Sequence, residues 1–463
     1  MPTDKETEQA APSSGSSPIL VLPVEITTEI FTHCILDSLD LVGQPDPNAA
    51  PLLLGCICNS WRSIAEGSPE LWNVLKIDRF EITTTLIEAW LSRAQALPLT
   101  LELKAREYDW DGDEEEEWDT ASVIPILKRH SLTWCEVTLV LPLQQLYLFG
   151  SDLALPRLES LTIYTDSLSA RGQPCNAFRN ASALRQLILG QAAHLALLQL
   201  PWTQLMSFDC ARPSSLEEYL TILRHTPNLV KSTVSIGHQS YHLPNVSPLT
   251  SFRSLSLDTH ISQTLDILDH VSVPALEVLD LARILFSGRI LVSRLHRSLS
   301  QHNHRLRILH IRIDHEVPRT EKFIRLLEIQ PMLEELHLIE GSLDLLIAVF
   351  QRLSDGSPFL PHLRGVAGSP PVYVPEITTK FSTTLDTLGD ALAARWTAPP
   401  ESFAQIRICD FFWYADASED LDSIVVAFRP RQAQLVALGI NVSLGWDEVH
   451  NDSGGLWDNY LLV

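Results

Sequence analysis

The sequence predicts an α/β fold built from stacked repeats, preceded by a small three-helix module. A pattern of apolar-x-x-apolar-x-apolar recurs between residues 158 and 368, and its copies begin 21 to 30 residues apart. The last two apolar positions alternate with a polar one, which is typical of a short strand with one buried face. Between the copies lie amphipathic stretches with helical spacing, such as residues 216–223 and 323–329.

Repeating units of this size must stack, because one strand and one helix cannot bury a core alone. Stacking puts parallel strands on a concave face and helices outside. The period resembles that of leucine-rich repeats and implies their horseshoe, although the Asn that normally follows the strand is missing. The alternative is an ordinary α/β domain whose Leu-rich strands only look periodic. The copies begin at Leu158, Leu184, Leu205, Leu229, Phe252, Leu276, Leu306, Leu333 and Leu363.

We place the repeat domain at residues 78–463, and its ends carry a weaker pattern. Residues 99–103 and 137–140 are expected to form its first strands. Residues 406–408 and 424–428 are expected to be its closing strands, before a Trp-rich C-terminal cap.

An acidic insertion is expected within this domain at residues 107–120. Residues 109–119 contain eight carboxylates, but the sixth and twelfth positions lack the Gly and Glu that a calcium loop needs. A solvated, disordered segment is the simplest interpretation. The alternative is an acidic segment that attracts a basic client, with Trp110 and Trp118 as apolar anchors.

The N-terminal part begins with a polar, acidic stretch, residues 1–17, which we expect to be a disordered leader. A small helical module is expected at residues 18–77. Pro23 suits the first position of a helix, where its missing N–H and fixed φ cost nothing. Ile26, Ile30 and Cys34 then recur every four residues and form one apolar stripe.

A second helix is expected at residues 51–66, and a short turn beginning at Pro69 follows it and delivers Leu71 and Trp72. Three short helices bury little surface by themselves, so this module needs something to pack against. The apolar face of the second helix is expected to contain Leu54, Cys58, Trp61 and Ala65.

This arrangement resembles the F-box, specifically the F-box-like domain common in mushroom-forming fungi. The chain departs from that pattern at Asn59-Ser60, where a basic pair is usual, and at Thr27-Thr28, which are β-branched. The matching residues stand in the order that the resemblance requires: Leu22, Pro23, Glu25, Ile26, Ile30, Phe31, Cys58, Trp61, Arg62, Leu71 and Trp72.

The resemblance implies that the module docks on the adaptor subunit of a cullin-based ubiquitin ligase of the SCF type. The repeats would then hold a client protein, so the chain would be a substrate receptor and not an enzyme. The alternative is a non-catalytic interaction scaffold with no role in ubiquitination. The residues that the resemblance assigns to adaptor binding are Leu22, Pro23, Ile26, Ile30, Phe31, Cys58 and Trp61.

The composition excludes several other classes of function. With 34 basic and 57 acidic residues the formal net charge is −23, which repels nucleic acid and anionic lipid and attracts a basic partner. No run of eighteen apolar residues would span a membrane. The seven cysteines show neither a disulfide framework nor a zinc pattern, so we expect a cytoplasmic or nuclear protein.

No catalytic or cofactor-binding motif stands out in the sequence. His302, His304, His310 and His315 are interspersed with arginines, and we expect a solvated turn between repeats there and not a metal site. Cys56 and Cys58 lack a partner pair, so burial is the preferred interpretation over metal ligation. We therefore expect no catalytic, cofactor or metal residues.

Overall fold

The structure is a computed structural model that describes residues 22–36, 42–78, 82–105, 120–151, 153–165, 174–190, 198–238, 243–259, 267–284, 288–301, 305–312, 320–339, 342–355, 358–369, 377–397, 404–414 and 419–447. The expected leader, nearly all of the acidic insertion and the last sixteen residues of the expected cap lie outside these ranges. The chain forms two compact units. Unit 1 contains Met1–Asp166 and Cys175–Ala183, and unit 2 contains Ser167–Pro174 and Leu184–Val463.

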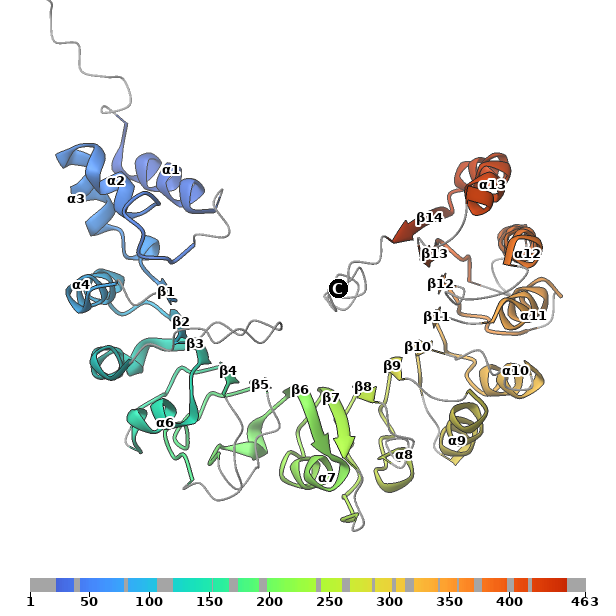
Figure 1. Cartoon of the computed structure of the whole chain (residues 1–463), viewed down its shortest axis with the longest axis horizontal. Coiled ribbons are helices and arrows are strands. Elements are labelled where there is room, and N and C mark those ends of the chain that lie inside the picture. The colour runs from blue at the N-terminus through green and yellow to red at the C-terminus, as the bar shows by residue number, and fades with distance from the viewer. Residues whose placement is uncertain are drawn as a thin grey trace, which may run out of the picture. The chain divides into compact units, whose positions relative to one another are not determined.

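The described residues form an α/β fold with 14 strands (Figure 1). Within each unit, strands that follow one another in the sequence are neighbours in the sheet. Neighbouring strands run parallel, for example with Leu309 of one strand beside Leu336 of the next. Unit 1 holds β1 (Val74–Ile77), β2 (Leu99–Lys104), β3 (Trp134–Val140) and β4 (Ser160–Tyr164). Unit 2 holds β5 (Gln186–Leu189), β6 (Ser207–Ser215), β7 (Lys231–His238), β8 (Ser254–Thr259), β9 (Val278–Ile284), β10 (Ile308–Arg312), β11 (Glu335–Ile339), β12 (Gly365–Gly368), β13 (Ile408–Tyr414) and β14 (Asn441–Asp447).

Helices connect the strands. Unit 1 contains α1 (Val24–Leu36), α2 (Leu52–Ile57), α3 (Asn59–Gly67), η3 (Pro69–Leu71), α4 (Thr84–Ala94), η4 (Thr120–Ser122), α5 (Ile124–Arg129), η5 (Ser131–Thr133), α6 (Leu143–Leu146) and η6 (Tyr147–Phe149). Unit 2 contains η8 (Trp202–Gln204), α7 (Leu216–His225), α8 (Ile267–His270), α9 (Gly288–Gln301), α10 (Thr320–Glu328), α11 (Leu343–Ser354), α12 (Ile377–Thr397) and α13 (Glu419–Ala437). In unit 2 the helices cover one side of the strands (Figure 1).

The repeated apolar residues form the core between sheet and helices. In β11, Leu336 and Leu338 are fully buried, as is Phe323 of α10. The parallel strands expected from the sequence are confirmed, because β4 to β12 begin two residues after the nine starting positions of the pattern. The strands expected around residues 99–103 and 137–140 are β2 and β3.

One expectation at the C-terminal end of the repeat domain is corrected. Residues 424–428 lie in the middle of α13 and not in a strand. Phe428 and Leu435, two helical turns apart, are buried while Val426 is exposed, so burial of one helix face overrides the β preference of the local sequence. The chain instead adds β14, which pairs with β13.

The helical module and the repeats meet earlier than expected. Residues Val74–Ile77 form β1, which pairs in parallel with β2. The sheet therefore begins inside the range 18–77 that we assigned to the helical module. The expected second helix is also divided, because Cys58 has an extended backbone (φ −158°, ψ 166°) that ends α2 and begins α3.

Candidate interaction surfaces

The three N-terminal helices of unit 1 enclose a small core of their own. Phe31 of α1 is fully buried and meets Trp61 of α3 edge to face, with ring centroids 5.1 Å apart. After α3, Trp72 donates a hydrogen bond from Nε1 to the Ala65 carbonyl oxygen at 2.7 Å. Trp72 also packs edge to face on Trp90 of α4, which joins the helices to the first repeat.

The junction between α2 and α3 is held by two polar contacts. Cys58 is the N-cap of α3, and its Sγ accepts a hydrogen bond from the Trp61 backbone N–H at 3.5 Å. Arg62 donates from Nε to the Gly55 carbonyl oxygen at 2.8 Å. These contacts fix the direction of α3 relative to α2 and thereby place Trp61 against Phe31.

Helix α1 buries a different side from the one its apolar stripe suggests. The buried residues are Thr27 and Phe31, and the Thr27 hydroxyl is satisfied by donation to the Pro23 carbonyl oxygen at 3.1 Å. Ile26 is 50% exposed, Ile30 is half-buried and Cys34 is exposed. The stripe therefore lies beside the buried side and faces outward.

Helix α2 also presents large apolar side chains to the outside. Leu53 and Ile57, one turn apart, are 44% and 56% exposed. Exposed aliphatic side chains also lie on or next to α1, and we use the name helical apolar surface for all of these exposed residues taken together. Among the described residues, its members are Leu22, Val24, Ile26, Leu36, Leu53 and Ile57.

The residues that we expected to bind an adaptor divide into three groups. Leu22, Pro23 and Ile26 are exposed. Ile30, Cys58 and Trp61 are half-buried, whereas Phe31 has no exposed surface. In this structure Phe31 and Cys58 support the helices from within, through packing and capping. The sequence reasoning did not select Val24, Leu53, Leu36 or Ile57, although Leu53 and Ile57 share the spacing of a helical stripe.

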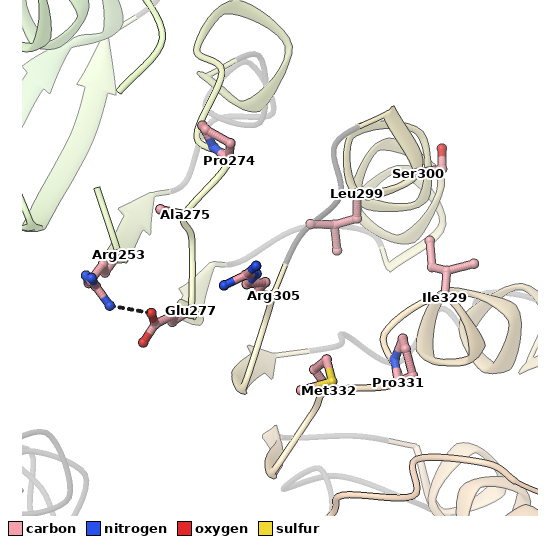
Figure 2. A pocket seen from close by; sticks show the side chains of 10 residues that line it. All are labelled: Arg253, Pro274, Ala275, Glu277, Leu299, Ser300, Arg305, Ile329, Pro331 and Met332. Atoms are coloured by element: carbon pink, nitrogen blue, oxygen red, sulfur yellow. Dashed lines mark hydrogen bonds and ion pairs between the residues drawn. The ribbon is translucent and has the colours of Figure 1, made fainter. Parts of the chain in front are cut away.

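Unit 2 contains a pocket with a volume of about 860 Å³ (Figure 2). It lies where helices end and the next strands begin, so its walls come from four successive repeats. In Figure 2 Arg253 and Glu277 lie on one side, with Leu299, Ile329 and Met332 on the other. Its lining consists of Arg253, Pro274, Ala275, Glu277, Leu299, Ser300, Arg305, Ile329, Pro331 and Met332.

A series of ion pairs joins the strand starts beside this pocket. Arg253 Nη1 lies 2.6 Å from Glu277 Oε1 (Figure 2), and Arg307 binds both carboxylate oxygens of Glu334 at 2.9 Å. The hydrogen bond from Arg307 lowers the pKa of Glu334 and raises the pKa of Arg307 itself. Exposed pairs of this kind contribute little stability. The Arg253–Glu277 pair holds one charged wall of the pocket in position, because both of its members line the pocket.

The expected solvated histidine turn is corrected at the one member that the structure describes. His310 lies in β10 and is buried, because the strand continues through it. His302, His304 and His315 lie outside the described residues. Cys56 is exposed and Cys58 is half-buried, so the expected burial of this pair is wrong. Among the described residues, no helix is both long and apolar enough to cross a membrane.

These features define an α/β repeat protein with a helical apolar surface in one unit and a mixed pocket in the other. No protein-family model matches the sequence, and no curated protein matches it. Among solved structures, the leucine-rich repeat-containing protein LegL7 from Legionella pneumophila is similar with a TM-score of 0.32 and 15% sequence identity. The match covers 65% of this chain and 92% of that one.

Proposed function

We propose that this chain is the substrate-recognition subunit of a cullin-RING ubiquitin ligase of the SCF type. Its N-terminal helices would bind the adaptor subunit as an F-box does, and its leucine-rich-repeat-like array would bind a client protein. The observation that carries the proposal is the helical apolar surface, in which Ile26 and Ile57 are half or more exposed. A contiguous set of apolar side chains that a chain leaves uncovered is typical of a docking surface, and the proposal takes these residues to form such a set.

The size of these side chains makes docking energetically reasonable. Complete burial of one Leu, Ile or Val contributes about 1.5–3 kcal/mol. The partly exposed aliphatic residues of this surface therefore offer several kcal/mol, which can offset the loss of translational and rotational freedom on association. The buried contact of Phe31 with Trp61 supports such a surface by fixing α1 against α3.

The repeats supply the client-binding half of the proposal. The pocket of unit 2 combines an apolar wall with fixed charges, which suits a peptide segment with mixed side chains. The net charge of −23 favours a basic client. In this role the chain performs no bond chemistry, since it accelerates transfer by holding the client close to the enzyme that carries ubiquitin.

The adaptor-binding half is tested by affinity purification of the tagged full chain from cells. We expect the adaptor and the cullin to copurify with the wild-type chain and to be lost with Ile26→Asp/Ile57→Asp. Leu132→Asp is the matched control, because Leu132 is 57% exposed, as Ile57 is at 56%, but belongs to η5. Adaptor retained by the Ile26→Asp/Ile57→Asp variant, or absent from the wild-type sample, contradicts the proposal.

The receptor role is tested separately. Proteomics after proteasome inhibition should show proteins that accumulate and copurify with the wild-type chain but not with the double variant. If the adaptor copurifies and no such protein accumulates, the chain is an interaction scaffold and the receptor role is wrong.

A further inference from the structure

A cluster of metal-ligating side chains lies on β10 and β11, and none of its members lines the pocket. His310 and His337 are direct neighbours in the parallel register of these strands. Glu335 precedes His337 by two residues, so both project from the same face of β11. Their strand neighbours Leu336 and Leu338 fill the core on the opposite face.

The three side chains converge closely. One potential ligand atom from each of His310, Glu335 and His337 lies within 4.8 Å of the other two. The two imidazoles are stacked, with ring centroids 4.0 Å apart and planes 17° apart. Nε2 of His310 is buried and has no hydrogen-bond partner among the described residues, and a buried polar atom of this kind requires an explanation.

The surroundings keep the two imidazoles neutral. Burial lowers the pKa of His310, and burial together with His310 lowers the pKa of His337 to about 3. A neutral imidazole has a free lone pair, which is the form that binds a metal ion. Burial also raises the pKa of Glu335, and a cation at this position would favour its carboxylate.

The strand on the other side of His310 provides a supporting carboxylate. Asp280 of β9 is the register neighbour of His310, and its Oδ1 lies 3.8 Å from Nδ1 of His310. Asp280 in turn accepts a hydrogen bond from the Ser256 hydroxyl at 2.9 Å. A carboxylate near Nδ1 favours the tautomer that carries its proton there and leaves Nε2 as the ligand atom, as in carboxylate–histidine–metal arrangements.

We propose that His310, His337 and Glu335 bind a divalent transition-metal ion of the zinc type. Two imidazoles and one carboxylate are a common ligand set for Zn²⁺ with an open fourth position, whereas Ca²⁺ and Mg²⁺ prefer oxygen ligands alone. Zn–N bonds of about 2.0–2.1 Å in a tetrahedral site place the ligand atoms roughly 3.4 Å apart. Small rotations of the three side chains close the cluster around an ion.

The test is a titration of the metal-free full chain with Co²⁺, which takes the same ligands and absorbs visible light. We expect one Co²⁺ per chain, a d–d band of a tetrahedral or five-coordinate site, no thiolate-to-cobalt charge transfer, and displacement by Zn²⁺. The band should vanish with His310→Gln and with His337→Gln. It should remain with the control His362→Gln, because His362 is exposed and belongs to the adjacent repeat.

Glu335→Gln keeps the test decisive if the histidine variants do not fold, because Glu335 is only half-buried. Its circular dichroism should match the wild type while its affinity for Co²⁺ falls by about tenfold or more. The proposal is overturned if the wild-type chain shows no band, or if a charge-transfer band reveals cysteine ligands. It is also overturned if the band persists in His310→Gln or if the affinity for Co²⁺ is unchanged in Glu335→Gln.

Discussion

At the scale of single residues, the most consequential positions are buried polar side chains in unit 2. His310 and His337 occupy the same place in two consecutive strands, so stacking of the repeats stacks their rings. Arg395 of α12 is also buried, and it donates hydrogen bonds to the carbonyl oxygens of Leu353, Phe359 and Leu360. Burial of a polar group costs free energy unless a partner is present. Arg395 has three carbonyl acceptors, whereas Nε2 of His310 has no hydrogen-bond partner among the described residues.

We expect the histidine pair to make the metal-free chain less stable in acid. Their folded-state pKa values are lowered below the ordinary value, so the unfolded chain binds more protons and stability falls as the pH drops from about 6.5 toward the folded pKa of His337, about 3. Glu335 acts in the opposite direction, since its raised pKa favours the folded state in acid. The carboxylate of Asp280 faces His310 from the neighbouring strand.

The measurement is the urea midpoint of the wild type and of His337→Gln between pH 7 and pH 5. Because Glu335 and Asp280 are present in both, their contributions largely cancel in the difference. The wild type should lose stability more steeply than the variant. Equal slopes would show that His337 is not buried in the neutral form.

Arg395 should be a strong stabiliser of the α11–α12 connection. Arg395→Met keeps the aliphatic stem but leaves three carbonyl oxygens without this donor, so we expect a loss of about 2–5 kcal/mol in unfolding free energy. Chemical denaturation measures the change. Arg407→Met, at an exposed arginine before β13, is the control and should stay within about 0.5 kcal/mol of the wild type.

At the scale of secondary-structure elements, helix ends decide how the N-terminal helices are arranged. The expected single helix at residues 51–66 is two helices because Cys58 is extended and caps α3. A thiol is a weaker acceptor than a hydroxyl, so this cap is open to improvement.

We therefore expect Cys58→Ser to preserve or raise the stability of α3, and Cys58→Ala to lower it by about 0.5–1 kcal/mol. Hydrogen exchange of the first backbone amides of α3, including that of Trp61, reports the difference locally. Faster exchange in the Ser variant than in the Ala variant would contradict the capping role.

The alternation of apolar and polar residues that marks a strand was readable in the sequence. A strand begins two residues after each of Leu276, Leu306 and Leu333. Alternating burial in a strand requires alternating apolar residues, and these can be recognised within a short stretch of sequence. Residues 424–428 misled the prediction, since a β-branched run became part of α13 through burial of Phe428 and Leu435. Burial of this kind depends on neighbours that are distant in the sequence.

At the scale of the whole molecule, the repeats behave as a chain of nearest neighbours. Among the described strands of unit 2, each strand from β6 to β13 pairs with the strands before and after it in the sequence, as β11 does with β10 and β12. A substitution that destabilises one repeat should therefore also destabilise its neighbours, and the effect should decrease with distance along the array.

Leu336→Ala tests this. Leu336 is fully buried in β11, so the substitution should cost about 2–5 kcal/mol. Hydrogen exchange should accelerate in β10, β11 and β12 and remain unchanged in β1 to β3. The control Met332→Ala, at a residue that is 45% exposed, should have little effect in either region. Uniform acceleration along the chain would indicate a single cooperative core instead of an array.

The sequence by itself determined where most strands of the repeats lie, because the apolar periodicity of a strand depends only on a few adjacent residues. It also contained a clue to the histidine cluster, since His310 and His337 stand between the same apolar positions of two consecutive copies. Only the tertiary structure decided that α1 buries Thr27 and Phe31 and leaves Ile26 outside. Lateral neighbours select which face of a helix is covered and which side chains of separate strands meet, and such neighbours are set by stacking and not by local periodicity.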